Sequence, residues 1–177
     1  MNYKINFNST FANRGMGLEN DINETNKYYN KYNIALIYKK PTPIRISKVD
    51  YKNMKITDGF FEAPSTLDYN GIYKGKYIEF DAKETKNKTS FPISNIHRHQ
   101  IDYVRKLLEH QGIVFLIIRF SSLNKDYLLR GEDLISFLNL EDRKSIPIDY
   151  FKEKGYLLEL RYAPRLDYLK IVDKYLL

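Results

Sequence analysis

The chain has 177 residues, of which 43% are hydrophobic and 15% aromatic, so it can bury one sizeable core, and nothing in its length calls for a second domain. Lys and Arg number 29 against 22 Asp and Glu, and the net charge of +7 favours polyanionic partners without specifying which. The absence of cysteine excludes a disulfide framework, a thiolate metal site and a cysteine nucleophile.

The first elements follow a polar N-terminal tail. Residues 1–12 predict a flexible tail without the apolar core of a signal peptide, and no later stretch approaches about 18 apolar residues, so we expect a cytoplasmic protein without a membrane partner. Residues 13–177 would form a single domain. The stretch 13–32 predicts a helix with Leu18, Ile22 and Tyr29 near helical spacing, and IALIY at 34–38 predicts a short buried strand.

A basic extension is predicted at about 39–65. From Lys39 to Lys55 the chain has six basic residues and one acid, Asp50, with prolines at the base and an alternating strand at 44–49. A DNA-contacting extension and a solvated edge hairpin kept soluble by lysine both fit this pattern.

Residues 67–73 and 76–83 predict a hairpin around the two-residue loop Lys74-Gly75. Residues 94–112 then predict a helix, with Ser94 or Asn95 as N-cap and Gly112 at its end. Its inner face would carry Ile101, Val104 and Leu108. The apolar run 113–120 predicts a central strand, 127–130 a further strand, 131–140 a helix and 164–177 a last amphipathic helix.

The hairpin register assembles four polar side chains on one face. With this loop, paired residues have numbers that sum to 149, which places Asp68 opposite Asp81 and Thr66 opposite Lys83. Facing acids are destabilising unless a divalent cation such as Mg²⁺, which prefers carboxylate oxygens, lies between them.

This set of groups suits phosphodiester hydrolysis. A metal ion would activate water and orient the phosphate, while Lys83 would meet the developing charge. The alternative is an ion pair between Asp81 and Lys83 on a solvated strand face. His97 and His99 lie two residues apart, which is not the spacing of a zinc-binding helix.

Several motifs occur in an order that resembles the RecU family of Holliday junction resolvases, within the PD-(D/E)xK nuclease superfamily. They are NRGMGLE, KKPTPI, DYNG, KYIEFDAKETKNKTSFP, HRHQI and YAPRLDYL, and they span almost the whole chain. The resemblance implies an α/β, restriction-endonuclease-like nuclease domain with a mixed β-sheet flanked by helices and a protruding basic extension. This chain departs from the family in three respects. Asp81 stands where the family usually has Glu, the tail ahead of NRG is shorter, and so is the stretch between KPTPI and STLDY.

The resemblance also implies roles for particular residues. Metal ligands would be Thr66, Asp68, Asp81 and Gln100, with Asp68, Asp81 and Lys83 as the catalytic residues and Lys83 as the transition-state stabiliser. Glu19 corresponds to an acid that related junction resolvases use near the metal, although an ordinary first-turn helix acid fits equally well.

The implied partners are four-way junction DNA, a second copy of the chain in a homodimer, and a recombinase. Mg²⁺ is the expected cofactor, with Mn²⁺ able to substitute, and DNA contacts are expected from Arg14, Arg45 and Lys48. Two other hypotheses remain. The chain is a catalytically weak junction-binding or recombinase-modulating protein, or it is a nuclease that acts on ordinary duplex DNA.

Overall fold

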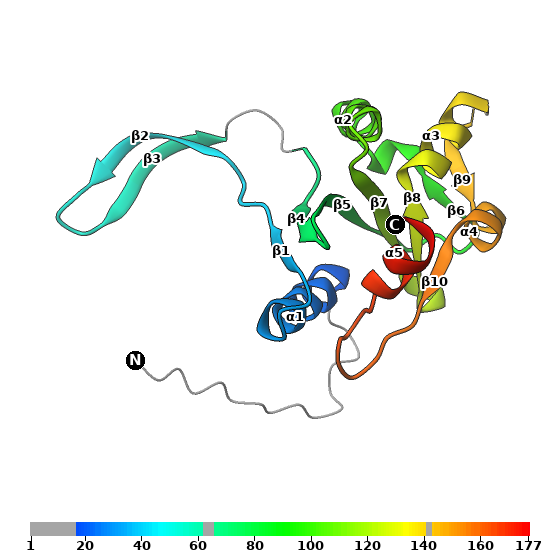
Figure 1. Cartoon of the computed structure of the whole chain (residues 1–177). Coiled ribbons are helices and arrows are strands. Elements are labelled where there is room, and N and C mark those ends of the chain that lie inside the picture. The colour runs from blue at the N-terminus through cyan, green and yellow to red at the C-terminus, as the bar shows by residue number, and fades with distance from the viewer. Residues whose placement is uncertain (1–16, 62–65, 141–142) are drawn as a thin grey trace.

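The computed structural model describes residues 17–61, 66–140 and 143–177, so the predicted tail at 1–12 and Arg14 lie outside the described residues. A six-stranded mixed sheet, in the order β1-β4-β5-β7-β8-β10, forms the centre of the molecule (Figure 1). Its strands are β1 (Leu36–Lys39), β4 (Tyr69–Tyr73), β5 (Lys76–Thr85), β7 (Ile113–Phe120), β8 (Lys125–Arg130) and β10 (Tyr156–Leu158). The helices are α1 (Leu18–Lys31), α2 (Arg98–Glu109), α3 (Gly131–Leu140), α4 (Ile148–Lys154) and α5 (Leu169–Tyr175).

The predicted β4–β5 hairpin register is confirmed. Tyr73 pairs with Lys76 and Tyr69 pairs with Phe80, so the paired numbers sum to 149. Lys74 and Gly75 have φ angles of 49° and 75°, which is the pair of left-handed residues that a tight two-residue hairpin loop needs. The turn therefore sets which residues of β5 face which neighbour.

Helices cover both faces of the sheet, which confirms the predicted α/β class. On one face, Phe80 and Phe115 pack against α1 and α5 in a core that also contains Ile22 and Leu169. On the other face, side chains of β7 and β8 pack against α2, α3 and α4. The apolar run of β7 is buried along its whole length between two neighbouring strands, as predicted for a central strand.

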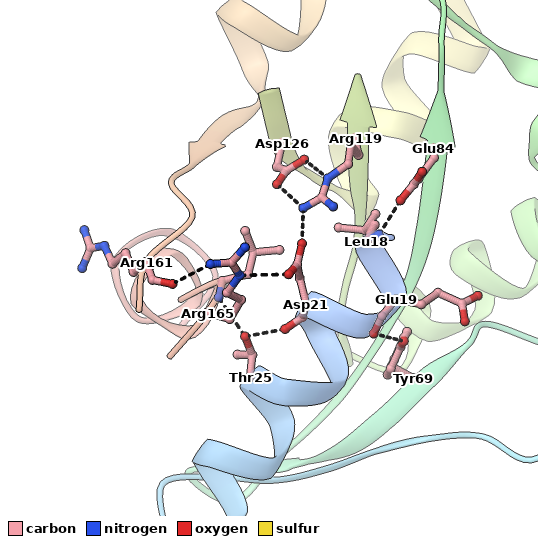
Figure 2. A network of polar contacts seen from close by, with 11 residues as sticks. Leu18, Glu19, Asp21, Thr25, Tyr69, Glu84, Arg119, Asp126, Arg161 and Arg165 are labelled. Atoms are coloured by element: carbon pink, nitrogen blue, oxygen red, sulfur yellow. Dashed lines mark hydrogen bonds and ion pairs between the residues drawn. The ribbon is translucent and has the colours of Figure 1, made fainter. Parts of the chain in front are cut away.

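A buried ion-pair network attaches α1 to the far end of this sheet. Figure 2 shows Arg119 of β7 bound to both carboxylate oxygens of Asp126, at 2.7 and 2.8 Å, and to Asp21 of α1 at 2.7 Å. Arg165 contacts the other oxygen of Asp21 at 3.0 Å. The network thereby fixes the start of α1 against the strands.

The basic extension is a two-stranded hairpin that protrudes from the body of the molecule (Figure 1). It consists of β2 (Ile44–Asp50) and β3 (Lys55–Phe61), and we call this hairpin the stalk. All of its strand residues are exposed except Asp50, which is partly buried. The predicted protruding extension is therefore confirmed, and an isolated hairpin of this kind has little stability of its own.

Two predicted details are wrong. The apolar strand near 34–38 is the sheet edge, so Leu36 and Tyr38 are 46% and 51% exposed and only one face is buried. The helix predicted from residue 94 begins at Arg98, because His97 and Gln100 form a reciprocal capping box.

Other differences concern short elements and helix ends. Leu107 is buried where Leu108 was expected, and the last helix is restricted to α5. The short strands β6 (Ser90–Pro92), β9 (Ser145–Pro147) and β10 and the helix α4 were not predicted, because strands of three residues and a helix of seven carry too little periodicity. Among the described residues, no helix has the length and apolar character needed to cross a membrane.

Candidate metal and DNA site

The site is built on one face of β5. Glu79 and Asp81 have no exposed surface, and the side chain of Lys83 is 19% exposed, so the interpretation of a solvated strand face is wrong. The Lys83 ammonium lies 2.9 Å from Oδ2 of Asp81. The expected ion pair thus exists, but it lies in a protected environment in which charge interactions are stronger than in water.

Asp68 and Asp81 affect each other across the hairpin. Asp68 directly precedes Tyr69, which pairs with Phe80, so the register continues toward an Asp68–Asp81 pair. Burial, together with the neighbouring Asp68 carboxyl group, raises the pKa of Asp81 to about 7, even though Lys83 partly offsets both effects. The carboxyl group of Asp81 is therefore costly to ionise unless a cation joins it.

Gln100 contacts the site from the first turn of α2. Its amide nitrogen donates to Oδ2 of Asp81 and to the carbonyl of Thr66, both at 3.1 Å. Its amide oxygen accepts from the His97 backbone N–H at 3.2 Å. The structure thus brings Gln100 to Asp81, with the nitrogen facing the carboxylate, and a ligand role would require the amide to rotate.

The donor set suits a divalent metal ion. Oδ1 of Asp81 is buried without any hydrogen-bond partner among the described residues, which is expensive for a carboxylate oxygen. A hard cation coordinated by this oxygen and by Asp68 would satisfy it. Within the described part of the chain, no three His, Cys, Asp or Glu residues cluster as a metal site, so oxygen ligands beyond the two acids have to come from other groups.

Glu79 is a buried acid that the sequence analysis did not single out. Its Oε1 is ion-paired with Lys40 and accepts from the Thr66 hydroxyl at 3.2 Å. Its Oε2 accepts from the hydroxyl groups of Tyr77 and Tyr103. The sequence does place Glu79 on the same strand face as Asp81, because it lies two residues earlier. Most of its partners, however, come from distant segments of the chain, so its contacts could not be predicted from local sequence.

A pocket of about 460 Å³ lies beside this face at the start of α1, where Lys83, Glu84 and Glu19 are among its lining residues. Figure 2 shows a contact between two of the lining residues, in which Glu84 accepts a hydrogen bond from the backbone N–H of Leu18. Glu19 is ion-paired with Lys39, and its carbonyl accepts from the Tyr69 hydroxyl at 3.4 Å. Glu19 therefore lies at the pocket next to Lys83, which is compatible with a role near the site.

The expected DNA-contacting residues of the stalk lie away from β5. Arg45 and Lys48 are on β2, they are exposed, and neither forms an ion pair with another described residue. Figure 1 shows the stalk extending from the side of the sheet on which β1 and β4 lie. These two side chains can meet a ligand that also reaches the β5 face only if that ligand is large.

Comparisons with known proteins agree with the motifs. The family model for RecU, recombination protein U, matches residues 13–174. The chain is 51% identical over 170 residues to the Holliday junction resolvase RecU of Bacillus cytotoxicus, covering 93% of this chain and 85% of that protein. It is 51% identical over 173 residues to the Holliday junction resolvase RecU of Oceanobacillus iheyensis, covering 94% and 88%.

A solved structure with partial similarity is that of Hjc, a Holliday junction resolvase of Archaeoglobus fulgidus. The two chains are 7% identical with a TM-score of 0.44, over 77% of this chain and 93% of the other.

Proposed function

The chain belongs to the RecU family, and on that premise we propose that it is an endonuclease that resolves Holliday junctions by paired nicks during homologous recombination and DNA repair. The main structural support for this function is the buried carboxyl group of Asp81. It has one oxygen without a partner, and Asp68 and Lys83 lie beside it. Such a site is suited to a reaction in which negative charge builds up on a phosphate.

The reaction depends on a divalent metal ion, and we propose Mg²⁺, with Mn²⁺ able to substitute. Asp68 and Asp81 would hold the ion, together with Thr66 and, after rotation of its amide, Gln100. When bound, such an ion lowers the pKa of a coordinated water and polarises the phosphate. The cation would also compensate the negative charge of Asp81, which burial otherwise disfavours.

Lys83 would stabilise the transition state. Its contact with Asp81 at 2.9 Å holds the ammonium on the face where the phosphate must approach. A group fixed in this way needs no reorganisation when charge develops on the phosphate. Helix α2 covers the same face and excludes water from Asp81, which strengthens each of these interactions.

The stalk would select the four-way junction. A junction offers several phosphate backbones within reach of one molecule, so DNA bound at β5 can also contact the stalk. Arg45 and Lys48 would contact phosphates, and such contacts bind without sequence preference and weaken with salt. Arg14 is proposed as a further DNA contact from the part of the chain before α1.

A homodimer is proposed because two opposed strands must be cut. On one face of the edge strand β1 and its neighbours β4 and β5, four apolar side chains are exposed, namely Leu36 at 46%, Tyr38 at 51%, Ile72 at 57% and Tyr77 at 41%. Contiguous apolar surface of this kind is typical of an interface. We propose that a second copy covers it, and sedimentation of the wild type and of a Leu36→Lys, Ile72→Lys variant would test this assembly. The recombinase partner stays a prediction from the family resemblance.

Selectivity for the junction is the test of the proposed function. The purified chain would be incubated with a synthetic four-way junction and with a linear duplex of matched sequence, each with and without Mg²⁺. We expect symmetrical nicks in the junction with Mg²⁺ only, and little cleavage of the duplex. Equal cleavage of both substrates would favour a nuclease of ordinary duplex DNA.

A further inference from the structure

The buried acid Glu79 has all of its hydrogen-bonding capacity occupied. Lys40 and Thr66 contact Oε1, while Tyr77 and Tyr103 contact Oε2. Asp81, two residues later on the same face, has an oxygen with no partner among the described residues. The two acids therefore differ in what they can bind. All lone pairs of the Glu79 carboxylate accept hydrogen bonds from the protein, whereas Asp81 has an oxygen that can still bind a ligand.

Two of the four partners of Glu79, Lys40 and Thr66, come from the segments before and after the stalk. Lys40 directly precedes the segment that leads into β2, and Thr66 belongs to the segment that returns from β3 to β4. The Lys40 ammonium contacts the Thr66 hydroxyl at 2.6 Å as well as Glu79. One buried carboxylate thus fastens both ends of the stalk to β5.

The same contacts fix the segment that carries Asp68. The backbone N–H of Lys40 donates to the Asp68 carbonyl at 2.7 Å. From the other side, Gln100 donates to the Thr66 carbonyl at 3.1 Å. The segment 66–68 is held by Lys40 and Glu79 on one side and by α2 on the other, so its position depends on the ion pair.

We propose that Glu79 and Lys40 are positioning residues, which clamp the base of the stalk to β5 and so hold Asp68 at the distance from Asp81 that a divalent metal ion requires. The inference rests on the proposed function, because it assigns these residues to the same metal site. Groups that orient metal ligands in this way typically change metal affinity by 10-fold to 100-fold when they are replaced.

Metal binding without DNA is the direct readout. Glu79→Gln keeps the shape of the side chain and removes its charge, while Lys40, whose side chain is 20% exposed, can turn to solvent. We expect the Mn²⁺ concentration at half-maximal thermal shift to rise about 10-fold. We also expect junction affinity in EDTA to stay unchanged and the cleavage rate at saturating Mn²⁺ to stay within a few-fold of wild type.

Asp173→Asn is the matched control. Asp173 also accepts from a tyrosine hydroxyl, that of Tyr73 at 2.9 Å, and is paired with a lysine, Lys74 at 2.6 Å, but it belongs to α5 and contacts the turn end of the hairpin. This variant should change stability and leave the Mn²⁺ dependence as in wild type. An equal Mn²⁺ shift in both variants would mean that the effect is general destabilisation and would overturn the proposal.

Further outcomes decide the remaining alternatives. The proposal is overturned if the Mn²⁺ dependence of Glu79→Gln is the same as that of the wild type. It is also overturned if Glu79→Gln binds the junction more tightly in EDTA, because Lys40, once released from Glu79, would then be a DNA contact. If Glu79→Gln does not fold, Tyr103→Phe removes a single hydrogen bond from Oε2, 3.2 Å long, and should raise the half-maximal Mn²⁺ concentration about 3-fold. No change in Tyr103→Phe contradicts the proposal.

A wild type that binds Mn²⁺ but cuts no junction would defeat the proposed function while leaving this comparison intact.

Discussion

The ammonium group of Lys83 lies 2.9 Å from Oδ2 of Asp81, on the face of β5 that α2 covers. We expect Lys83→Ala to reduce junction cleavage by about 10²-fold or more, the loss that follows removal of one preorganised group facing transition-state charge. Junction affinity should change little, because a single lysine contributes a small part of the attraction of a chain with net charge +7.

Single-turnover cleavage and a binding titration would be measured side by side for Lys83→Ala. Lys76→Ala is the control, because Lys76 is an exposed lysine at the other end of the same strand. A Lys83→Ala protein that cleaves at the rate of Lys76→Ala would exclude the proposed role of Lys83.

Asp81→Asn should stabilise the metal-free protein. The pKa of Asp81 is raised to about 7 by burial and by Asp68, whereas in the unfolded chain it is about 3.9. Between these values the folded wild type binds more protons than the unfolded chain, so its stability falls as the pH rises toward 7 and stays lowered above it. We expect a gain of about 1 to 2 kcal/mol in Asp81→Asn at pH 8, or about 3 to 6 °C in Tm.

Thermal unfolding in EDTA at pH 5 and pH 8 checks this prediction. The difference in Tm between Asp81→Asn and wild type should be smaller at pH 5, where most wild-type Asp81 carboxyl groups are already protonated. A difference that is larger at pH 5 than at pH 8 would show that the sign of the pKa shift is wrong.

Arg45→Ala and Lys48→Ala should weaken junction binding through the loss of phosphate contacts. Each variant is expected to reduce the slope of log affinity against log salt concentration by about one, with the fold unchanged. Lys152→Ala, at an exposed lysine of α4 paired with Asp149 at 2.6 Å, is the control and should keep the wild-type slope. If both stalk variants keep that slope too, the stalk does not contact the DNA backbone and is only a solvated hairpin.

Arg119→Met should strongly destabilise the fold. The substitution leaves Asp126 buried without its guanidinium partner and removes one of two arginines from Asp21, so we expect a loss of about 3 to 5 kcal/mol in the free energy of unfolding. Arg105→Met, which removes an exposed hydrogen bond of 2.9 Å to Asn139, should cost less than about 1 kcal/mol. Urea unfolding of the two variants compares them directly, and equal losses would mean that the network in Figure 2 adds no particular stability.

The hairpin that carries the site could be predicted because its information is local. Lys74-Gly75 specifies the turn, and the turn specifies every pair up to Tyr69 and Phe80. The burial of Glu79 could not be predicted in the same way, because its partners Lys40 and Tyr103 are 39 and 24 residues away in the chain. A charged residue on an alternating strand indicates solvent unless such distant partners are known.

The edge position of β1 could not be predicted from local sequence patterns either. The apolar run 34–38, which overlaps the start of β1, suits a buried strand, and only the pairing of the whole sheet shows that β1 has a single neighbour among the described strands, β4. The contact of Gln100 with Asp81 came from family resemblance rather than from periodicity, since a polar residue near a helix start is ordinarily exposed. Long-range pairing, together with short elements such as β6, β9 and α4, is therefore what the sequence left open.

Cleavage of a four-way junction by the wild type and by Asp81→Asn, over a titration of Mg²⁺ with protein in excess, tests the central claim most directly. We predict that the wild type gives paired, symmetrical nicks that depend on Mg²⁺, whereas Asp81→Asn binds the junction in EDTA at least as tightly and gives no product at any Mg²⁺ concentration. Cleavage by Asp81→Asn at the wild-type rate would place the chemistry elsewhere, and a wild type that binds the junction but cuts it with neither Mg²⁺ nor Mn²⁺ would make the chain a junction-binding protein instead.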